Sequence, residues 1–335
     1  MRLKTRGRFN VKRLARVLAD HLGGTPFERA LRTALRAGRH EFAFGWNRGL
    51  GDVALGLVPL FARIRAADPA SRIVVFTRAD LADMFRLTDA DAVHVVAGTV
   101  RGNPIDPVAS AAAMGVALSP SATVFADPDP TRWLDGRRHA FPPSLRWNAD
   151  WNARADRLVP AGEGTIDIGA HVSSETAQYY GYVKDWPAAR WRELFARVSA
   201  GRNVRWLLFG NAADVAFPQP DIVDLRGRTD FLDLLAVIRA RCRVLVAPDS
   251  GVLTAAYYLA QSFPLDVVSL WSDPRQGVLK QGCPSPNPML RHVSLVGNGD
   301  DVRNVAVDDV ERAVGAALAR NAPPARESWS HAPPR

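Results

Sequence analysis

The sequence predicts an α/β protein with two units, each built on a parallel sheet that is covered by helices. Its 335 residues are about twice the roughly 150 residues of an average domain. Strand patterns alternate with helix patterns over residues 41–96 and again over residues 165–271. This alternation is typical of parallel sheets, because neighbouring parallel strands need a crossover helix between them.

The first unit follows a helix predicted over residues 26–37, which Gly38 ends. Apolar runs predict three strands, and amphipathic stretches between them predict two helices. The strands cover residues 41–46, 72–77 and 92–96, and the helices cover residues 53–67 and 81–85. Residues 103–160 are rich in Pro and Trp, and residues 98–150 are weakly patterned. We expect a linker near residues 157–164.

The second unit repeats the same rhythm. We expect strands over residues 165–170, 204–210, 222–227, 243–248 and 266–271, and helices over 187–199, 231–241, 252–261 and 308–320. The predicted division is therefore a basic helical extension, two α/β domains, a C-terminal helix and a tail. These cover residues 1–40, 41–160, 161–305, 306–320 and 321–335.

The net charge of +9 comes entirely from residues 1–40, which hold 11 Lys and Arg against two acidic residues. A nucleic-acid-binding fold is expected to spread its basic residues over a face of the body, so we expect no nucleic acid partner. Residues 11–22 predict a basic amphipathic helix. Docking of residues 1–22 on an anionic membrane and a merely solvated extension both fit this pattern, and liposome binding with and without these residues separates them.

Cys242 and Cys283 are too few for a disulfide framework or a cysteine-based zinc site. The chain has no apolar run of the ~18 residues that span a bilayer, and its basic start lacks the apolar region of a secretory signal. We expect a cytoplasmic protein without a metal or other cofactor, peripheral on the inner face of the inner membrane if residues 1–22 dock there.

The first motif is the turn GWNRGLGD, which joins a predicted strand to a predicted helix. Gly49 and Gly51 allow the backbone to approach a ligand, and Asp52 would direct a carboxylate toward it from the start of the helix. Asp is also a favoured N-cap residue, so a purely structural role explains Asp52 equally well.

Two further motifs also follow predicted strands. Ser173 and Ser174 come after the strand at 165–170, and Lys184 precedes a helix that Pro187 begins, where an ammonium could reach a phosphate or simply be solvated. Ligands of open α/β sheets bind at the carboxyl ends of the strands. The stretch APDSGVLT carries Asp249, Ser250, Gly251 and Thr254 and predicts a diphosphate-sized anion site, with a capped helix as the alternative.

Taken in this order, the motifs resemble those of glycosyltransferase family 9, the heptosyltransferase-like enzymes of lipopolysaccharide core assembly. The resemblance rests on Gly-x-Gly-Asp at 49–52, Lys-x-Trp-Pro at 184–187, Asp-Leu-x-Gly-x-Thr at 224–229 and Asp-Ser-Gly at 249–251, within residues 41–320. It implies the GT-B fold, in which two Rossmann-like domains face each other across a cleft. It also implies sugar transfer from a nucleotide donor with inversion, without a metal.

The resemblance implies a role for each matching residue. Asp52 would be the general base that deprotonates the acceptor hydroxyl, and Lys184, Ser250 and Gly251 would hold the donor diphosphate. Asp249 would orient that turn or contact the donor sugar. Ser173, Ser174 and Thr254 would complete the donor side. The implied donor is ADP-heptose, and the implied acceptor is a lipopolysaccharide core or another envelope glycan.

Three departures from the family pattern concern the sugar and the acceptor. Thr254 stands where many members have a His, and the segment between Gly169 and Lys184 is longer than usual and contains Tyr179, Tyr180 and Tyr182. Residues 272–288 keep only a trace of a threonine-aspartate-proline segment. A small-molecule or protein acceptor therefore remains an alternative.

Other classes of protein fit less of the sequence. Tyr180 and Lys184 have the Y-x-x-x-K spacing of short-chain dehydrogenases, but that pair needs a continuous helix, and Gly181 and Pro187 oppose one. Two Asp-x-Asp patterns, at 89–91 and 127–129, could serve a metal-dependent transferase, but both have turn-like surroundings. An inactive nucleotide-sugar-binding protein is disfavoured by the presence of Asp52, Lys184 and Asp249.

Overall fold

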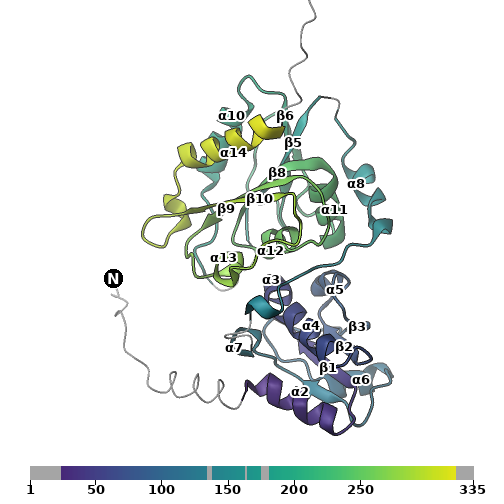
Figure 1. The fold of residues 1–335 in the computed structure, drawn as a ribbon. Coiled ribbons are helices and arrows are strands. Elements are labelled where there is room, and N and C mark those ends of the chain that lie inside the picture. The colour runs from purple at the N-terminus through teal and green to yellow at the C-terminus, as the bar shows by residue number, and fades with distance from the viewer. Residues whose placement is uncertain (1–23, 134–137, 163, 175–180, 322–335) are drawn as a thin grey trace, which may run out of the picture. The chain divides into compact units, whose positions relative to one another are not determined.

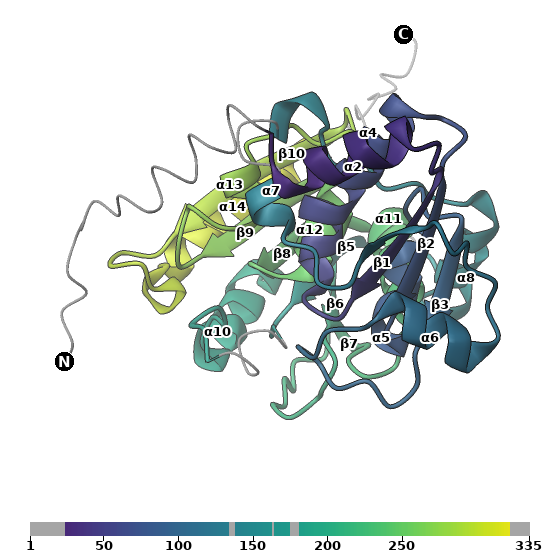
Figure 2. The ribbon, with the colours of Figure 1, turned by 90° about the horizontal axis from the view of Figure 1, so that it is seen from below.

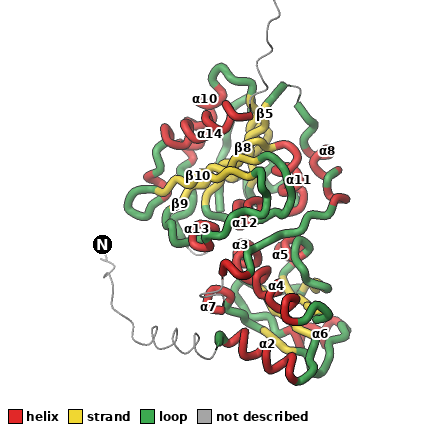
Figure 3. Tube along the Cα trace, viewed as in Figure 1, coloured by secondary structure: helices red, strands yellow, loops and turns green. Residues whose placement is uncertain are grey.

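The computed structural model describes residues 24–133, 138–162, 164–174 and 181–321. The chain forms two compact units, each with one all-parallel sheet, and Figure 3 shows the strands of each in yellow. The first unit contains the described residues up to Ala149 with Thr254–Gln261 and Arg275–Asn287, and the second contains the rest. The predicted α/β class with two parallel sheets is confirmed. The division into functional domains at residue 160 stays a prediction.

The sheet of the first unit has the strand order β3-β2-β1-β4. Its strands are β1 (Glu41–Trp46), β2 (Arg72–Thr77), β3 (Ala92–Val95) and β4 (Thr123–Phe125). Central β1 pairs with β2 along its whole length and with β4 over three residues. Strands β1 and β2 have the predicted bounds. Strand β4 was not predicted, because only three residues form it within the weakly patterned stretch 98–150.

Helices cover both faces of this sheet (Figures 1 and 2). On one face the ring of Phe44 packs against Phe61 of α4 and Phe125 of β4, with ring centroids 5.0 and 4.8 Å apart. On the other face Val74 packs near Ala111 of α6. The helices of this unit are α2 (Pro26–Arg36), α3 (Leu50–Asp52), the π-helix η1 (Val53–Leu57), α4 (Val58–Ala67), α5 (Ala79–Phe85), α6 (Pro107–Met114), α7 (Pro130–Trp133), η2 (Arg138–Ala140) and α13 (Gly277–Gln281), and η3 (Ala149–Trp151) begins at its last residue before the second unit.

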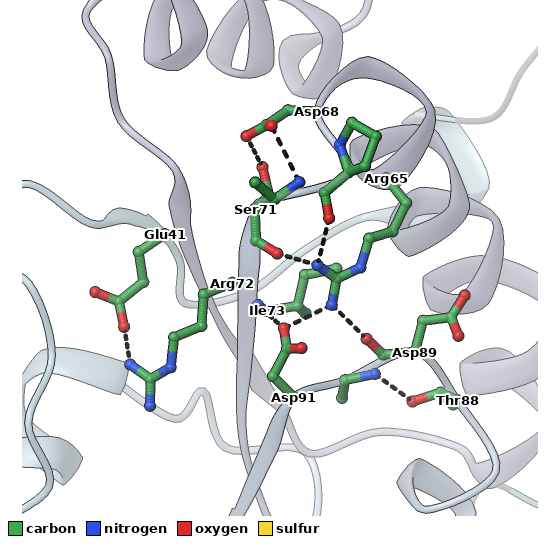
Figure 4. A network of polar contacts seen from close by, with 12 residues as sticks. Glu41, Arg65, Asp68, Ser71, Arg72, Ile73, Thr88, Asp89 and Asp91 are labelled. Carbon is green, nitrogen blue, oxygen red and sulfur yellow. Dashed lines mark hydrogen bonds and ion pairs between the residues drawn. The ribbon is translucent and has the colours of Figure 1, made fainter.

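Arg65 closes the amino end of this sheet (Figure 4). Its guanidinium donates to the carbonyl of Asp89 at 3.1 Å, to the carboxylate of Asp91 at 2.6 Å and to the carbonyl of Ser71. The same carboxylate accepts the backbone N–H of Ile73 at 2.6 Å. Helix α4 and the starts of β2 and β3 are thus tied together at the edge opposite the carboxyl ends of the strands.

The sheet of the second unit has the order β10-β9-β8-β5-β6-β7. Its strands are β5 (Ile166–His171), β6 (Val204–Phe209), β7 (Ile222–Asp224), β8 (Cys242–Pro248), β9 (Leu265–Trp271) and β10 (Leu290–Val296). Strand β10 was not predicted. It is a partly exposed edge strand whose sequence LRHVSLV neither alternates cleanly nor forms a continuous apolar run.

Helices α10 and α14 pack together and share one core with this sheet. Helix α10 buries Trp191, Leu194, Phe195 and Val198, the spacing of a single helical face. Helix α8 packs against α11, in the stretch where we expected part of a linker. The helices are α8 (Ala153–Leu158), α10 (Ala188–Ser199), α11 (Phe231–Arg241), α12 (Gly251–Tyr257, whose last turn belongs to the first unit), η4 (Val302–Asn304) and α14 (Val307–Asn321).

Two predicted segments lie outside the described residues. These are the basic helix at 11–22 and nearly all of the tail at 321–335. Within the described ranges, none of the helices has the length and apolar character needed to cross a membrane.

Gly45 in β1 provides a test of the close packing over this sheet. A Cβ added there would lie 2.1 Å from the carbonyl oxygen of Ile105, which is backbone and cannot move aside cheaply. We expect Gly45→Ala to lower the free energy of unfolding by about 1–3 kcal/mol. Denaturant unfolding of the purified protein measures this change.

Gly315→Ala in helix α14 is the matched control. A Cβ added there meets nothing within 4 Å, so the substitution should stabilise the protein by about 0.5–1 kcal/mol through helix propensity. Equal effects of the two substitutions would contradict the packing described for Gly45.

Candidate active site

Asn47 fixes the beginning of the glycine-rich turn after β1. Its side-chain amide donates to the backbone carbonyl of Asn103 at 2.7 Å and to that of Val100, and its Oδ1 accepts from Arg78 at 2.7 Å. Asn47 is buried, and its partners lie after β2 and in the loop following β3. Sequence reasoning missed this residue, although a polar residue directly after a buried strand is the signal that could have indicated it.

Asp52 stands in the first helical turn and is exposed. Gly49 occupies the N-cap position of α3, and Asp52, which directly precedes η1, makes no side-chain capping hydrogen bond. The structure therefore does not support a capping role for the Asp52 carboxylate. A Cβ at Gly49 would lie 2.8 Å from Oδ2 of Asp52, so the glycine leaves room for this carboxylate. Gly51 directly precedes Asp52 within α3. A carboxylate in the first turn also interacts favourably with the helix dipole.

The helical stretch that contains Asp52 is not a regular α-helix throughout. It begins at Leu50, three residues before the predicted start, and passes through the π-helix η1 before α4 begins. Pro59 at the start of α4 has no N–H to donate to the preceding turn, which accounts for the break in the α-helical pattern. Single π turns inside helices are frequent at functional sites.

Lys184 lies on an irregular segment that is anchored in the second unit. The indole of Trp186 is buried and donates to the carbonyl of Val305 at 3.0 Å. The carbonyl of Val183 accepts from the hydroxyl of Ser272, directly after β9. The Trp of the Lys-x-Trp-Pro motif is therefore a buried anchor, and it holds Lys184 at the carboxyl edge of the sheet.

Lys184 and Asp249 form an ion pair with 2.6 Å between Nζ and Oδ2. Their side chains are only 15% and 11% exposed. Asp249 directly follows β8, and its backbone N–H donates to Leu270 of β9 at 3.2 Å. The structure thus brings together two predicted site residues that lie 65 positions apart in the sequence.

Ser250 caps helix α12 through its hydroxyl, which accepts the N–H of Leu253 at 3.2 Å. Gly251 is the first residue of that helix. Thr254 is buried farther along α12, in the segment that belongs to the first unit. The structure therefore groups Ser250 and Gly251 with Asp249, and Thr254 stays a prediction on the donor side.

Ser174 is buried after β5, and its backbone N–H donates to the carboxylate of Asp185 at 2.6 Å. Burial raises the pKa of Asp185, Asp214 adds to the rise, and the Ser174 N–H and Lys184 oppose it. The sequence analysis did not identify Asp185, because only the fold brings it next to its partner Ser174. The hydroxyl of Ser173 lies close to Gly210, which follows β6: a Cβ added to Gly210 would lie 3.3 Å from Oγ of Ser173.

His171 ends β5 and is buried, and burial alone lowers the pKa of its imidazole to about 4. The side chain is therefore neutral near pH 7. Its Nδ1 is buried and finds no hydrogen-bond partner within the part of the chain that the structure describes.

The Asp-Leu-x-Gly-x-Thr motif has a structural role in the second unit. Its first residue, Asp224, accepts hydrogen bonds from the guanidinium of buried Arg226 at 2.9 and 2.7 Å and from the backbone N–H of the same residue at 3.1 Å. Asp230, directly after the motif, caps helix α11 by accepting the N–H of Asp233 at 2.6 Å. The motif therefore shapes the turn between β7 and α11.

The two Asp-x-Asp patterns are engaged in ion pairs. Asp91 pairs with Arg65 at 2.6 Å, Asp89 pairs with Arg146 at 2.6 Å, and Asp127 pairs with Arg48 at 2.6 Å. The first two carboxylates line a cavity of about 410 Å³ at the amino end of the first sheet. Among the described residues, no group of three or more His, Cys, Asp or Glu side chains is arranged to hold a metal ion.

Comparison with solved structures shows the GT-B fold. The E. coli ADP-heptose lipopolysaccharide heptosyltransferase II is similar over 84% of this chain and 99% of that chain, with a TM-score of 0.58 and 16% identity. The iron-containing dodecameric glycosyltransferase TibC of enterotoxigenic E. coli is similar over 84% of this chain and 77% of that chain, with a TM-score of 0.53 and 14% identity. No curated protein sequence matches the chain.

Residues 143–273 match the model of glycosyltransferase family 9 (heptosyltransferase). The matched stretch includes Lys184, Asp249, Ser250 and Gly251. The family resemblance that the motifs predict is therefore confirmed in this part of the chain, which makes up most of the second parallel sheet.

The short-chain dehydrogenase alternative is contradicted by the backbone at Lys184. This residue lies in an irregular segment, and helix α10 begins only at Ala188. Tyr180 lies outside the described residues. A Tyr and a Lys one helical turn apart on a continuous helix are therefore not available here.

Asp185 provides a test of the electrostatics near Lys184. Because its pKa is raised in the folded protein, the ionised form destabilises the fold near pH 7, and this penalty disappears as pH falls below the unfolded value near 3.8. Asp185→Asn keeps an oxygen that can accept the Ser174 N–H and removes the charge. We expect a higher melting temperature for the variant at pH 7.

The difference from the unsubstituted protein should shrink as pH is lowered from 7 to 4, which thermal unfolding at several pH values measures. Asp185→Ala, which removes the acceptor as well, is the control and should not gain the same stability. A pH-independent difference for Asp185→Asn would contradict the raised pKa.

Proposed function

We propose that the protein is an inverting, metal-independent glycosyltransferase that transfers a sugar from a nucleotide-diphosphate donor to a hydroxyl group. The observation that carries the proposal is the Lys184–Asp249 pair beside the Ser250–Gly251 turn. These residues lie at the carboxyl ends of parallel strands, where open α/β sheets bind ligands, and within the stretch that matches the family.

The second unit would bind the donor. A departing nucleoside diphosphate gains negative charge, which preorganised donors must meet. An ammonium has three N–H donors, so Lys184 can keep its bond to Asp249 and still donate to a phosphate. Backbone N–H groups of Ser250 and Gly251 would meet the same diphosphate, and the hydroxyls of Ser173 and Ser174 would contribute from the end of β5.

The first unit would supply the general base. An inverting transfer needs a carboxylate that takes the proton of the attacking hydroxyl. Asp52 is exposed in the first helical turn after β1, so its carboxylate is accessible to an acceptor. Gly49 would contribute to general-base catalysis indirectly, because the absence of its side chain leaves the space that the Asp52 carboxylate occupies.

We infer that the donor is ADP-heptose and that the acceptor is a lipopolysaccharide core or another envelope glycan. The family model is that of heptosyltransferases, and heptosyltransferase II of E. coli is by its description an ADP-heptose enzyme. A small-molecule or protein acceptor is the second candidate, because Thr254 and the segment before Lys184 depart from the family pattern. We also propose a cytoplasmic location, on the inner face of the inner membrane if residues 1–22 dock there.

Asp52→Asn tests the base. The amide cannot accept the proton of the acceptor hydroxyl, so we expect turnover to fall by about 10²–10⁴-fold. Donor affinity should be retained, because Asp52 is not assigned to the donor. A coupled assay for released nucleoside diphosphate measures turnover, and calorimetry measures affinity.

The control for this substitution is Asp106→Asn, which removes an exposed carboxylate but keeps a residue able to cap helix α6. It should retain normal turnover. Undiminished turnover of Asp52→Asn would refute the base assignment.

Lys184→Ala tests the diphosphate site. The substitution removes a charge-assisted hydrogen bond and leaves Asp249 to repel the phosphates, so ADP affinity should fall by at least about tenfold. Isothermal titration calorimetry with ADP measures the change.

Lys280→Ala, at an exposed lysine of α13, is the matched control and should bind ADP normally. Unchanged ADP affinity of Lys184→Ala would refute the role of Lys184.

A further inference from the structure

An exposed aromatic ring borders the Lys184–Asp249 pair. Tyr182 is 55% exposed, and the centroid of its ring lies 5.7 Å from Nζ of Lys184. The same Nζ lies 2.6 Å from Asp249. The ring therefore adjoins the ammonium that the proposed function assigns to the donor diphosphate.

The residues that directly follow Tyr182 in the sequence are held in place by three contacts. The carbonyl of Val183 accepts from Ser272, Asp185 accepts from the N–H of Ser174, and Trp186 is buried in the core. The ring is thus presented to solvent from an anchored segment. A tyrosine ring in such a place offers contact area at a low cost in conformational entropy, because it has only two rotatable side-chain torsions.

We propose that Tyr182 is a specificity-determining residue whose ring stacks on a ring of the donor attached to the diphosphate. The proposal rests on the proposed function of Lys184. If the ammonium holds the diphosphate, the sugar or the nucleoside joined to that diphosphate lies within reach of a ring centred 5.7 Å away. The flat face of either group can pack on a tyrosine face, and both would bind by the same chemistry.

This role also accounts for a departure in the sequence. Tyr182 lies in the segment that is longer than usual for the resembling family, and the catalytic assignments leave it without a function. A change of residue at this position would alter which ring is preferred while leaving the diphosphate contacts in place.

The test measures the affinity of the full-length protein for three probes by isothermal titration calorimetry. The probes are inorganic diphosphate, ADP and ADP-heptose, and the variants are Tyr182→Ala and Tyr182→Phe. Tyr182→Ala should weaken binding of ADP-heptose by about 5- to 50-fold and leave binding of inorganic diphosphate unchanged. Tyr182→Phe keeps the ring and should bind all three probes normally.

The ADP affinity shows whether the Tyr182 ring stacks on the nucleoside or on the sugar of the donor. Weaker binding of both ADP and ADP-heptose by Tyr182→Ala assigns the stack to the nucleoside, and weaker binding of ADP-heptose alone assigns it to the sugar. Val293→Ala, which truncates an exposed side chain of β10 in the same unit, is the control and should have no effect.

Three results would overturn the proposal. They are unchanged affinities of Tyr182→Ala, an equal loss by Tyr182→Phe, and an equal loss of inorganic diphosphate binding. If the unsubstituted protein binds none of the three probes, the proposed function itself fails. If the unsubstituted protein binds them and Tyr182→Ala binds them equally well, only the stacking role fails, so the two failures are distinguishable.

Discussion

The ion pair between Lys184 and Asp249 is the interaction on which the donor side of the molecule depends. Both side chains are largely buried, so each charge has lost most of its hydration and needs the other. Removing either partner would leave an uncompensated charge at the edge of the sheet. The pair also joins the end of β8 to the segment before α10, and so it fixes the place from which an ammonium can meet an anion.

The surrounding structure makes this arrangement possible. Trp186 anchors the segment in the core beneath α10, and Asp185 connects it to the backbone after β5. Parallel pairing of β5, β8 and β9 brings the ends of these strands to the same edge. In the first unit Arg65 ties the amino edge together through its ion pair with Asp91 and its bonds to backbone carbonyls, whereas the carboxyl edge carries Asn47 and the turn that leads to Asp52.

Much of this architecture could be predicted from the sequence, because it depends on local patterns. Apolar runs predict the bounds of β1 and β2, and the motifs identify Lys184 and Asp249, whose contact only the fold establishes. Strand β4 and edge strand β10 were missed, since one is very short and the other is only partly buried. The π-helix was missed because helical periodicity predicts a regular helix there. Its Gly56 lies close to Pro130, a contact that only the fold brings about.

Asp185 and Asn47 show a different limit of sequence reasoning. Each makes its important contacts with residues that only the fold brings near, so no local pattern shows those contacts. The position of Asn47 directly after buried β1 is the one local signal. The same holds for Tyr182, whose meaning depends on its distance from Lys184.

A crystal structure of the protein with bound ADP tests the central claim most directly. The account predicts that the diphosphate lies against the backbone N–H groups of Ser250 and Gly251, with Nζ of Lys184 within hydrogen-bond distance of a phosphate oxygen. A diphosphate bound away from Lys184, or bound there without contact to this turn, would contradict it.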